Sequence, residues 1–393
     1  MDHFSIVAAI CRSSMKNPTP ALTGHIKRLS KALEKEGMQD QSDSLKGILQ
    51  AQSLQVEIQP SRVIMSRSAL VGEALIPNIK PPVDKESGSY LAEILQPADV
   101  KDTTPIFDTG LETSVSSLLE EWKNIDLLKS KGIEPALSLM LFGAPGTGKT
   151  LLAHHISAEL GYPIVIAKLD GLLSSFLGTT ARNISNLFSF ANRYKCILLL
   201  DEFDAIAKLR DDPNELGELK RVVNTLLQCL DERSKIGFTI AITNHEGLLD
   251  PAIWRRFDLR IAIPKPNTMA RHQIISNHFK EKLQISSARQ EFLAWMTHDF
   301  SGSDIEKLIF FLKRRMAILD NEFHFLEAVR EFIRLNANMP NYENQKIILT
   351  SEEELARHLK SDKSFPQSQQ AQLAELFDVK QPTVSKWLNK EKL

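Results

Sequence analysis

The feature that most constrains the fold of this sequence is a glycine-rich octapeptide, residues 143–150. It fits the pattern G-x-x-x-x-G-K-[ST] and directly follows an apolar run, residues 137–142. Glycines in such a loop let successive backbone amides point at a phosphate group, and the N-terminus of the helix that follows adds positive potential. The sequence therefore predicts a phosphate-binding loop between a strand and a helix. The residues expected to bind there are Gly143, Ala144, Pro145, Gly146, Thr147, Gly148, Lys149, Thr150 and Leu151.

Further short apolar runs alternate with helical patterns after this loop. They are residues 164–167, 197–200, 238–242 and 259–263. This alternation is typical of a parallel sheet built from crossover units. We therefore expect an α/β fold, a P-loop NTPase parallel sheet with a helical lid, plus small all-α modules at the N-terminal and C-terminal ends.

Breaks in the hydrophobic pattern divide the chain into five parts. Prolines and a Ser87-Gly88-Ser89 step mark a linker, Pro264 and Pro266 end the sheet region, and Pro340 lies in a polar break near the end. The expected parts are a helical N-terminal module at 1–55, a linker at 56–104, a large α/β subdomain at 105–266, a helical lid at 267–338 and a C-terminal helical module at 339–393.

The composition excludes several classes of protein. Lys and Arg number 48 and Asp and Glu 49, so the chain as a whole lacks the positive charge typical of nucleic-acid binders. Cys11, Cys196 and Cys229 are far apart and lack metal-ligand spacing, which argues against a disulfide framework or a zinc site. No apolar run approaches the roughly 20 residues of a membrane-spanning helix. We therefore expect a soluble cytoplasmic protein without a membrane partner.

Two acids directly follow the apolar run at 197–200. Carboxylates at the carboxyl ends of parallel strands lie where such sheets bind ligands, beside the phosphate loop. Thr150 and Asp201 are expected to hold Mg²⁺, with Asp201 acting through a water, and Lys149 to reach the β and γ phosphates of ATP. Glu202 is expected to polarise the attacking water as a general base. The pair therefore predicts hydrolysis of the nucleotide in addition to binding.

Over residues of about 105–338 these motifs resemble the AAA branch of P-loop ATPases, the group that holds FtsH, katanin and spastin. The resemblance implies an ATP hydrolase that works as a homohexamer on a polypeptide substrate. It implies that Asn244 helps to place the attacking water, and that Arg255 and Arg256 reach into a neighbouring subunit's site. A surface salt-bridge pair is the alternative for these arginines. The segment near adenine is similar at Thr109 and Gly110, and the start of the lid helix at Gly302 and Ser303.

A short segment after the second strand resembles the pore loop of AAA remodelling proteins: Phe176, Leu177 and Gly178. An aromatic ring on such a loop can grip an extended polypeptide without reading its sequence. The acidic residue that the family has after this glycine is missing here, and burial of Phe176 in the core is the alternative.

A second motif lies near the C-terminus, at about 369–390, and resembles a helix-turn-helix of the Cro and phage-repressor type. The outward positions of its second helix would be Gln381, Thr383, Ser385 and Lys386, which suit base edges and phosphates. Residues 380–393 contain four lysines and one glutamate, so a basic face exists within a neutral chain. Docking of a protein partner is the alternative for this module.

Two functions remain open from the sequence. The first is an ATP-driven protein remodeller; its layout resembles bacterial stand-alone AAA ATPases that are paired with a subtilisin-like serine protease. The second is a DNA-associated ATPase, acting as a regulator or a mobile-element factor through the C-terminal helices. The sequence names neither the substrate nor the number of subunits.

Overall fold

The computed structural model describes residues 4, 7, 20–35, 37–46, 72–100, 104–168, 172, 177–205, 216–249, 251–279, 283–336, 342–366 and 370–389. Every structural statement below concerns these residues. The chain separates into two compact units, Met1–Ser68 and Ala69–Leu393.

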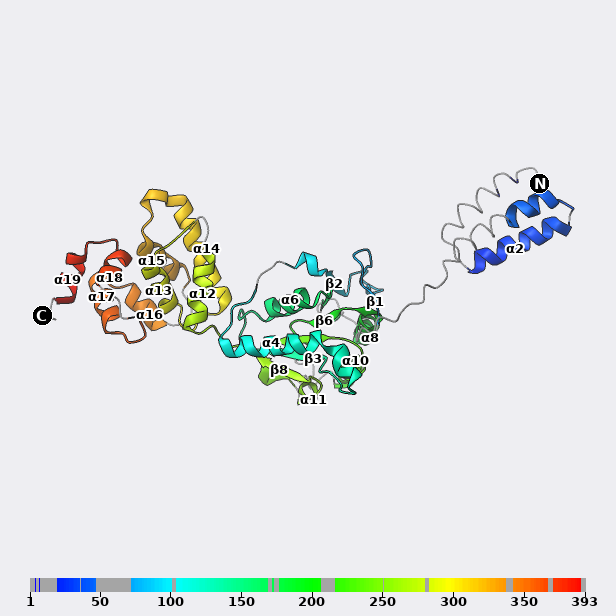
Figure 1. The fold of residues 1–393 in the computed structure, drawn as a ribbon, viewed down its shortest axis with the longest axis horizontal. Helices are drawn as coiled ribbons and strands as arrows, with labels where there is room; N and C mark the ends of the chain where they lie inside the picture. Colours follow the sequence, from blue (N-terminus) through cyan, green and yellow to red (C-terminus); the bar gives the residue numbers. More distant parts are fainter. Residues whose placement is uncertain are drawn as a thin grey trace. The chain divides into compact units, whose positions relative to one another are not determined.

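The first unit contains α2 (Pro20–Lys35) and a second helical stretch at residues 39–46 (Figure 1). Apolar side chains at helical spacing form its small buried core: Ile26, Leu33 and Leu45. The buried hydroxyls of Ser30 and Ser42 lie 3.0 Å apart and hydrogen-bond the two helical stretches to each other. For these residues the predicted helical structure is confirmed.

The second unit, shown in Figure 1, is built on a six-stranded sheet. Its strands lie in the order β2-β4-β6-β7-β3-β8. The strands are β2 (Ala92–Leu95), β3 (Ser138–Phe142), β4 (Ile164–Ala167), β6 (Ile197–Leu200), β7 (Thr239–Thr243) and β8 (Leu259–Ala262). All neighbours run parallel except β2, which is antiparallel to β4. The predicted parallel sheet is confirmed, with each predicted strand end within one residue of the observed one.

Helices cover both faces of this sheet. They are α4 (Thr109–Lys123), α5 (Ile125–Ser130), α6 (Lys149–Leu160), α8 (Leu177–Arg193), α10 (Leu216–Arg233) and α11 (Pro251–Trp254), with short 3₁₀ turns η1 (Pro97–Asp99) and η2 (Glu246–Leu248). Because side chains alternate along a strand, Leu139 and Leu141 of β3 pack with α4 and α6, while Met140 packs with α8 and α10. The strands are thus buried on both sides, which explains their continuous apolar runs.

The predicted linker at 56–104 is wrong for part of its length. Residues 92–95 form the edge strand β2, and β1 (Glu73–Ala74) pairs in parallel with β5 (Tyr194–Lys195). Leu75 and Leu91 are buried in the core beneath. Pro77, Pro81 and Pro82 lie between β1 and β2, and Pro97 begins η1 after β2, so none of these four prolines lies inside a strand. Residues 72–100 therefore belong to the α/β subdomain.

From Thr268 onward every described element is helical (yellow to red in Figure 1). The lid helices are α12 (Thr268–His278), α13 (Ser287–Met296), α14 (Gly302–Leu319) and α15 (Phe325–Leu335), with a 3₁₀ turn η3 (Asp320–Glu322). We call the helices that follow the tail: α16 (Tyr342–Ile348), α17 (Glu352–Ser361), α18 (Gln370–Leu376) and α19 (Gln381–Asn389).

The lid and the tail share one hydrophobic core, which differs from the separate modules predicted at 267–338 and 339–393. Phe292 and Phe332 from the lid and Leu355, Leu373 and Val384 from the tail belong to the same buried cluster. The sequence break around Pro340 lies outside the described residues, and the apolar faces of the helices before and after it pack against each other. The tail is therefore part of the lid's fold.

None of the helices in the described ranges combines the length and the apolar character that crossing a bilayer requires.

Candidate nucleotide-binding site

The predicted phosphate loop connects β3 to the N-terminus of α6. Gly148 is the residue before α6 and has φ +98°, a left-handed conformation that glycine adopts at little cost. Gly143 has φ +141°, and a Cβ there would lie 2.3 Å from the carbonyl oxygen of Ile263. Backbone from β8 thus passes too close to the start of the loop for any side chain. The two glycines give the loop its course from the sheet edge into the helix.

Lys149 points back into the loop. Its side chain is buried, and Nζ donates to the carbonyl oxygens of Gly143 (2.8 Å) and Ala144 (2.7 Å). Burial lowers the pKa of Lys149, although the nearby carboxylates of Asp201 and Asp204 act in the opposite direction. The positive charge of Lys149 beside the N-terminus of α6 would attract an anionic phosphate chain.

The two groups expected to hold the metal lie together. Thr150 ends the phosphate loop and Asp201 follows β6, and Thr150 Oγ1 donates to Asp201 Oδ2 at 2.9 Å. The other oxygen of Asp201 accepts the backbone N–H of Glu202 at 2.8 Å. Glu202 has φ +51°, an unusual conformation for a residue with a Cβ, and its side chain is exposed. The turn after β6 thus separates the two carboxylates, which fits their different predicted roles.

Asn244 follows the next strand of the sheet, β7, and lines the cavity described below, together with Thr150 and Asp201. Its backbone N–H donates to Asp204 Oδ1 at 3.5 Å, and the hydroxyl of Thr243 donates to the same oxygen at 3.3 Å. The buried Asp204 therefore ties the ends of β6 and β7 together. Sequence reasoning missed this residue, although a third acid two positions after Glu202 was a visible signal.

A cavity of about 790 Å³ lies over these groups. It brings together every predicted site residue from Pro145 to Leu151 with Asp201, Glu202, Asn244, Gly302 and Ser303. Side chains that were not predicted line it as well: Ile106, Phe107, Ile274, Asn277, His278 and Glu306. Thr109 and Gly110 do not line it; the chain enters α4 at Asp108, whose side chain caps that helix by accepting the N–H of Leu111.

The lid touches the phosphate loop at the start of α14. The N–H of Ser303 donates to the carbonyl oxygen of Gly146 at 3.0 Å. Gly146 has φ +75°, and a Cβ there would lie 2.7 Å from Ser301 Oγ. Ser301 caps α14 together with Asp304 in a capping box. The cavity is therefore closed on one side by a helix of the lid.

Two lid helices also supply side chains to the wall of the cavity. His278 at the end of α12 and Glu306 on α14 have Nε2 and Oε1 3.5 Å apart, and the His278 ring lies edge-on to Phe310. The sequence offers no signal for His278 and Glu306, because their helices are far along the chain from the phosphate loop.

The predicted arginines lie outside this chain's own cavity. Arg255 is exposed, whereas Arg256 forms an ion pair with Asp231 at 2.9 Å and donates to the carbonyl oxygen of Ala252 at 2.7 Å. The salt-bridge alternative thus describes Arg256, and Arg255 is the arginine that stays accessible to another chain.

The predicted pore loop cannot be placed. Phe176 lies outside the described residues, and for Leu177 and Gly178 only the helical backbone at the start of α8 is described.

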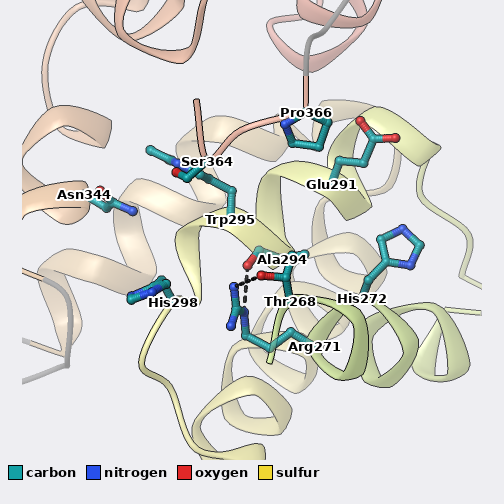
Figure 2. A pocket seen from close by; sticks show the side chains of 10 residues that line it. All are labelled: Thr268, Arg271, His272, Glu291, Ala294, Trp295, His298, Asn344, Ser364 and Pro366. Carbon is teal, nitrogen blue, oxygen red and sulfur yellow. Dashed lines mark hydrogen bonds between the residues drawn. The ribbon is translucent and has the colours of Figure 1, made fainter. Parts of the chain in front are cut away.

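A second, smaller cavity of about 250 Å³ lies between α12, α13 and the tail (Figure 2). Figure 2 shows Arg271 directed at Ala294 and Thr268. Its guanidinium donates to the carbonyl oxygens of Ala294 (2.9 Å) and Pro266 (3.0 Å) and to the hydroxyl of Thr268 (3.1 Å). Arg271 thus fastens the segment between sheet and lid to α13. The larger cavity, with its phosphate loop and carboxylates, is the better candidate for a nucleotide.

Comparison with known proteins agrees with this geometry. The family described as "ATPase family associated with various cellular activities (AAA)" matches residues 139–265. A proteasome-activating nucleotidase from Aeropyrum pernix is 31% identical over 289 residues, which cover 64% of this chain and 69% of that relative. The chain belongs to the AAA family of ATPases.

Other relatives match the AAA domain over shorter stretches. An uncharacterized AAA family ATPase, y4kL, from Sinorhizobium fredii is 44% identical over 163 residues, 42% of this chain and 49% of the relative. The ATP-dependent zinc metalloprotease FtsH from Aquifex aeolicus is 33% identical over 207 residues, 51% of this chain and 33% of FtsH. The chain thus spans half or less of the length of these two relatives.

Proposed function

We propose that this AAA protein binds ATP with Mg²⁺ in the large cavity and hydrolyses it to ADP and phosphate. The observation that supports this most directly is the 2.9 Å hydrogen bond between Thr150 and Asp201 beside the phosphate loop. A hydroxyl and a carboxylate are the hard oxygen donors that Mg²⁺ takes from a protein while phosphates and waters complete its shell. Bound Mg²⁺ would neutralise charge on the β and γ phosphates.

The chain's own residues divide the work of hydrolysis. Lys149 supplies a positive charge to the phosphates, and the loop amides before α6 hold their oxygens. Glu202, exposed at the turn after β6, accepts the proton of the attacking water, and Asn244 orients that water. Gly302 and Ser303 close the cavity from the lid.

Substitution of the proposed base tests this activity. In Glu202→Gln we expect turnover to fall by about 10²–10⁴-fold, the contribution of a general base, with ATP affinity retained. Glu134→Gln is a matched control, because Glu134 is also an exposed glutamate but lies outside the cavity. Wild-type turnover in Glu202→Gln would show that the base is wrong.

We further propose that copies of the chain assemble into a ring, as a homohexamer, with Arg255 completing the neighbour's site. Arg255 is exposed and lies outside its own cavity. A mixing experiment tests this: Glu202→Gln and Arg255→Ala are each expected to be inactive alone. In mixed rings roughly a quarter of the sites would combine an intact Glu202 with an intact Arg255 from the neighbour, so activity should return. A mixture as inactive as its components would exclude action between subunits.

The proposed use of this ATPase is the remodelling of a polypeptide in the cytoplasm. It is supported by the kinship with proteins named as a proteasome-activating nucleotidase and as the protease FtsH. Phe176→Ala should then abolish substrate processing and leave basal ATP hydrolysis intact. Unchanged processing would refute a pore role for Phe176. A separate subtilisin-like serine protease is the proposed consumer of the unfolded chain, which co-purification from the native source would test.

Binding of DNA by the tail is the second candidate. The observation that favours it is the surface of α19, where Gln381, Lys386 and Asn389 are exposed and Thr383 and Ser385 are half-buried. The turn before α19 contains Asp378 with φ +55°, and Lys380 beside it is exposed. Polar and basic side chains on one helix face suit phosphates and base edges.

The double variant Gln381→Ala/Lys386→Ala tests this candidate against Lys363→Ala, a matched control for charge. Duplex DNA should bind the control in a salt-dependent manner and the double variant more weakly, with a smaller slope against salt concentration. Equal binding of both variants at several salt concentrations would leave protein docking as the role of the tail.

A further inference from the structure

We propose that the tail is a rigid extension of the lid, so that the nucleotide in the cavity sets the position of the α19 surface relative to the α/β subdomain. This inference rests on the proposed binding of ATP. It does not depend on which partner the α19 surface takes.

The first observation is the continuous core. Buried side chains from α12 to α19 form a single cluster with members on both sides of the boundary between lid and tail, including Phe325, Ile348, Phe365, Leu376 and Val384. Interiors packed in this way have few alternative arrangements and transmit displacement. A hinge between lid and tail would have to separate these side chains and expose them to water.

The second observation is a set of polar contacts that cross the same boundary. Arg289 of α13 forms an ion pair with Asp378 in the turn between α18 and α19. Trp295 of α13 donates from Nε1 to Asp362 Oδ2 at 2.8 Å, just after α17. These contacts reach the tail at two separate points, so rotation about either one is blocked by the other.

A third contact fixes the start of the tail to α15. The buried guanidinium of Arg330 donates from Nε to the carbonyl oxygen of Ile348 (2.9 Å) and from Nη2 to that of Thr350 (2.7 Å). Within the tail, Arg357 of α17 donates from Nε to the carbonyl oxygen of Trp387 on α19 at 2.9 Å. α19 is therefore connected to the lid through fixed contacts at each step.

The connection between lid and α/β subdomain is of a different kind. The lid meets the phosphate loop at the hydrogen bond from Ser303 to Gly146 and supplies Ile274, His278 and Glu306 to the cavity wall. A nucleotide that fills the cavity touches both subdomains, so its presence and its γ phosphate select the lid position. Because the tail moves with the lid as one rigid body, the lid position that the nucleotide selects also sets the position of α19 relative to the α/β subdomain. By linkage, a partner that holds α19 in one position changes nucleotide affinity.

Distances between spin labels in the full-length chain test this inference. Cys11 and Cys229 are replaced by Ser, and Cys196 is left in place because it is buried. Labels at exposed positions report three distances: Glu120→Cys on α4, Ala317→Cys on the lid and Glu375→Cys on the tail. Labelled chains are mixed into an excess of unlabelled chains, so that distances within one chain dominate. Measurements are made without nucleotide, with ADP and with a non-hydrolysable ATP analogue.

The expected result is that the distances from Glu120 to Ala317 and from Glu120 to Glu375 shift together between nucleotide states. The distance from Ala317 to Glu375 should keep one narrow distribution in all states. A lid-to-tail distance that changes with nucleotide overturns the inference, and so does an unchanged α4-to-tail distance. Calorimetric titration of the same samples separates the two proposals, because absence of nucleotide binding refutes the proposed function itself.

Discussion

Substitution of Gly146 by Ala tests the contact between the phosphate loop and the lid. Gly146 has φ +75°, and a Cβ there would lie 2.7 Å from Ser301 Oγ and 2.9 Å from Ser303 Cβ. Gly161, the residue after α6, has φ +69°, and a Cβ added there would meet no atom within 4 Å. The two substitutions thus share the backbone strain of a left-handed alanine, and Gly146→Ala alone pushes against the lid.

The magnitude follows from these contacts. A left-handed alanine costs about 1–2 kcal/mol in either variant. In Gly146→Ala the lid must also move, which perturbs the cap of α14, worth about 0.5–2 kcal/mol, and the hydrogen bond from Ser303 to Gly146, worth about 1 kcal/mol. Taken together, closure of the lid over the nucleotide is destabilised by roughly 2 kcal/mol, which corresponds to a roughly 30-fold weaker affinity.

Titration with a fluorescent ATP analogue measures the dissociation constant, and urea unfolding measures the free energy of unfolding of each variant. We expect Gly146→Ala to lose more stability than Gly161→Ala, because it also disturbs the contacts with the lid, and only Gly146→Ala to lose affinity. If Gly161→Ala weakened nucleotide binding as much as Gly146→Ala, the loss would come from backbone strain and the proposed contact would have no role in closure.

Three further predictions concern the cores. Burial raises the pKa of Asp362, but hydrogen bonds from Ser364 and Trp295 outweigh it and hold that pKa below its ordinary value; Asp362→Asn should therefore cost about 1–2 kcal/mol of unfolding free energy at neutral pH. That difference from wild type should shrink in urea titrations as the pH falls below about 4, where the carboxyl protonates first in the unfolded state, and it should be gone once the pH lies below the lowered pKa of the folded state. Arg233, fully buried, donates to the carbonyl oxygens of Cys196 (2.9 Å) and Phe238 (3.0 Å), and the latter also accepts the N–H of Leu198. Arg233→Met removes the arginine donor from both oxygens and should cost about 1–3 kcal/mol; an unchanged urea midpoint would contradict this. Burial raises the pKa of the Cys196 thiol, so iodoacetamide should modify it far more slowly than it modifies glutathione, until urea unfolds the chain.

The residues that the sequence predicts for phosphate binding are close together in the chain, and the structure brings Pro145 to Leu151 and Asp201 to one cavity. The residues from Gly143 to Thr150 stand in one loop, and Asp201 directly follows an apolar strand, so spacing alone indicates their roles. The part of the cavity wall that comes from the lid was not predicted, since His278 and Glu306 come from two lid helices and meet only when these pack together. Thr109 and Gly110 were assigned two to three residues beyond the cavity, because the chain turns into α4 at Asp108.

The fold likewise contains elements that their own residues predict and others that depend on contacts between residues far apart in the chain. Strands buried on both faces gave continuous apolar runs that are easy to recognise, such as β4 and β6. The edge strand β2 was missed because it is short and lies among prolines, and its pairing with β4 joins residues some 70 positions apart. The polar break around Pro340 suggested a domain boundary, yet the packing of Ile348 and Leu355 onto the lid overrides it.

The shared core of lid and tail has a consequence for how this protein can be dissected. Removing the last two helices would uncover the sides of α13 and α17 that pack against α18 and α19, in the buried core that lid and tail share. A shortened chain would then expose an apolar surface and would be prone to aggregate. Loss of any activity in such a deletion would report misfolding as readily as loss of a partner. Single exchanges on the outer face of α19 leave the interior intact, and they are the informative way to ask what the tail holds.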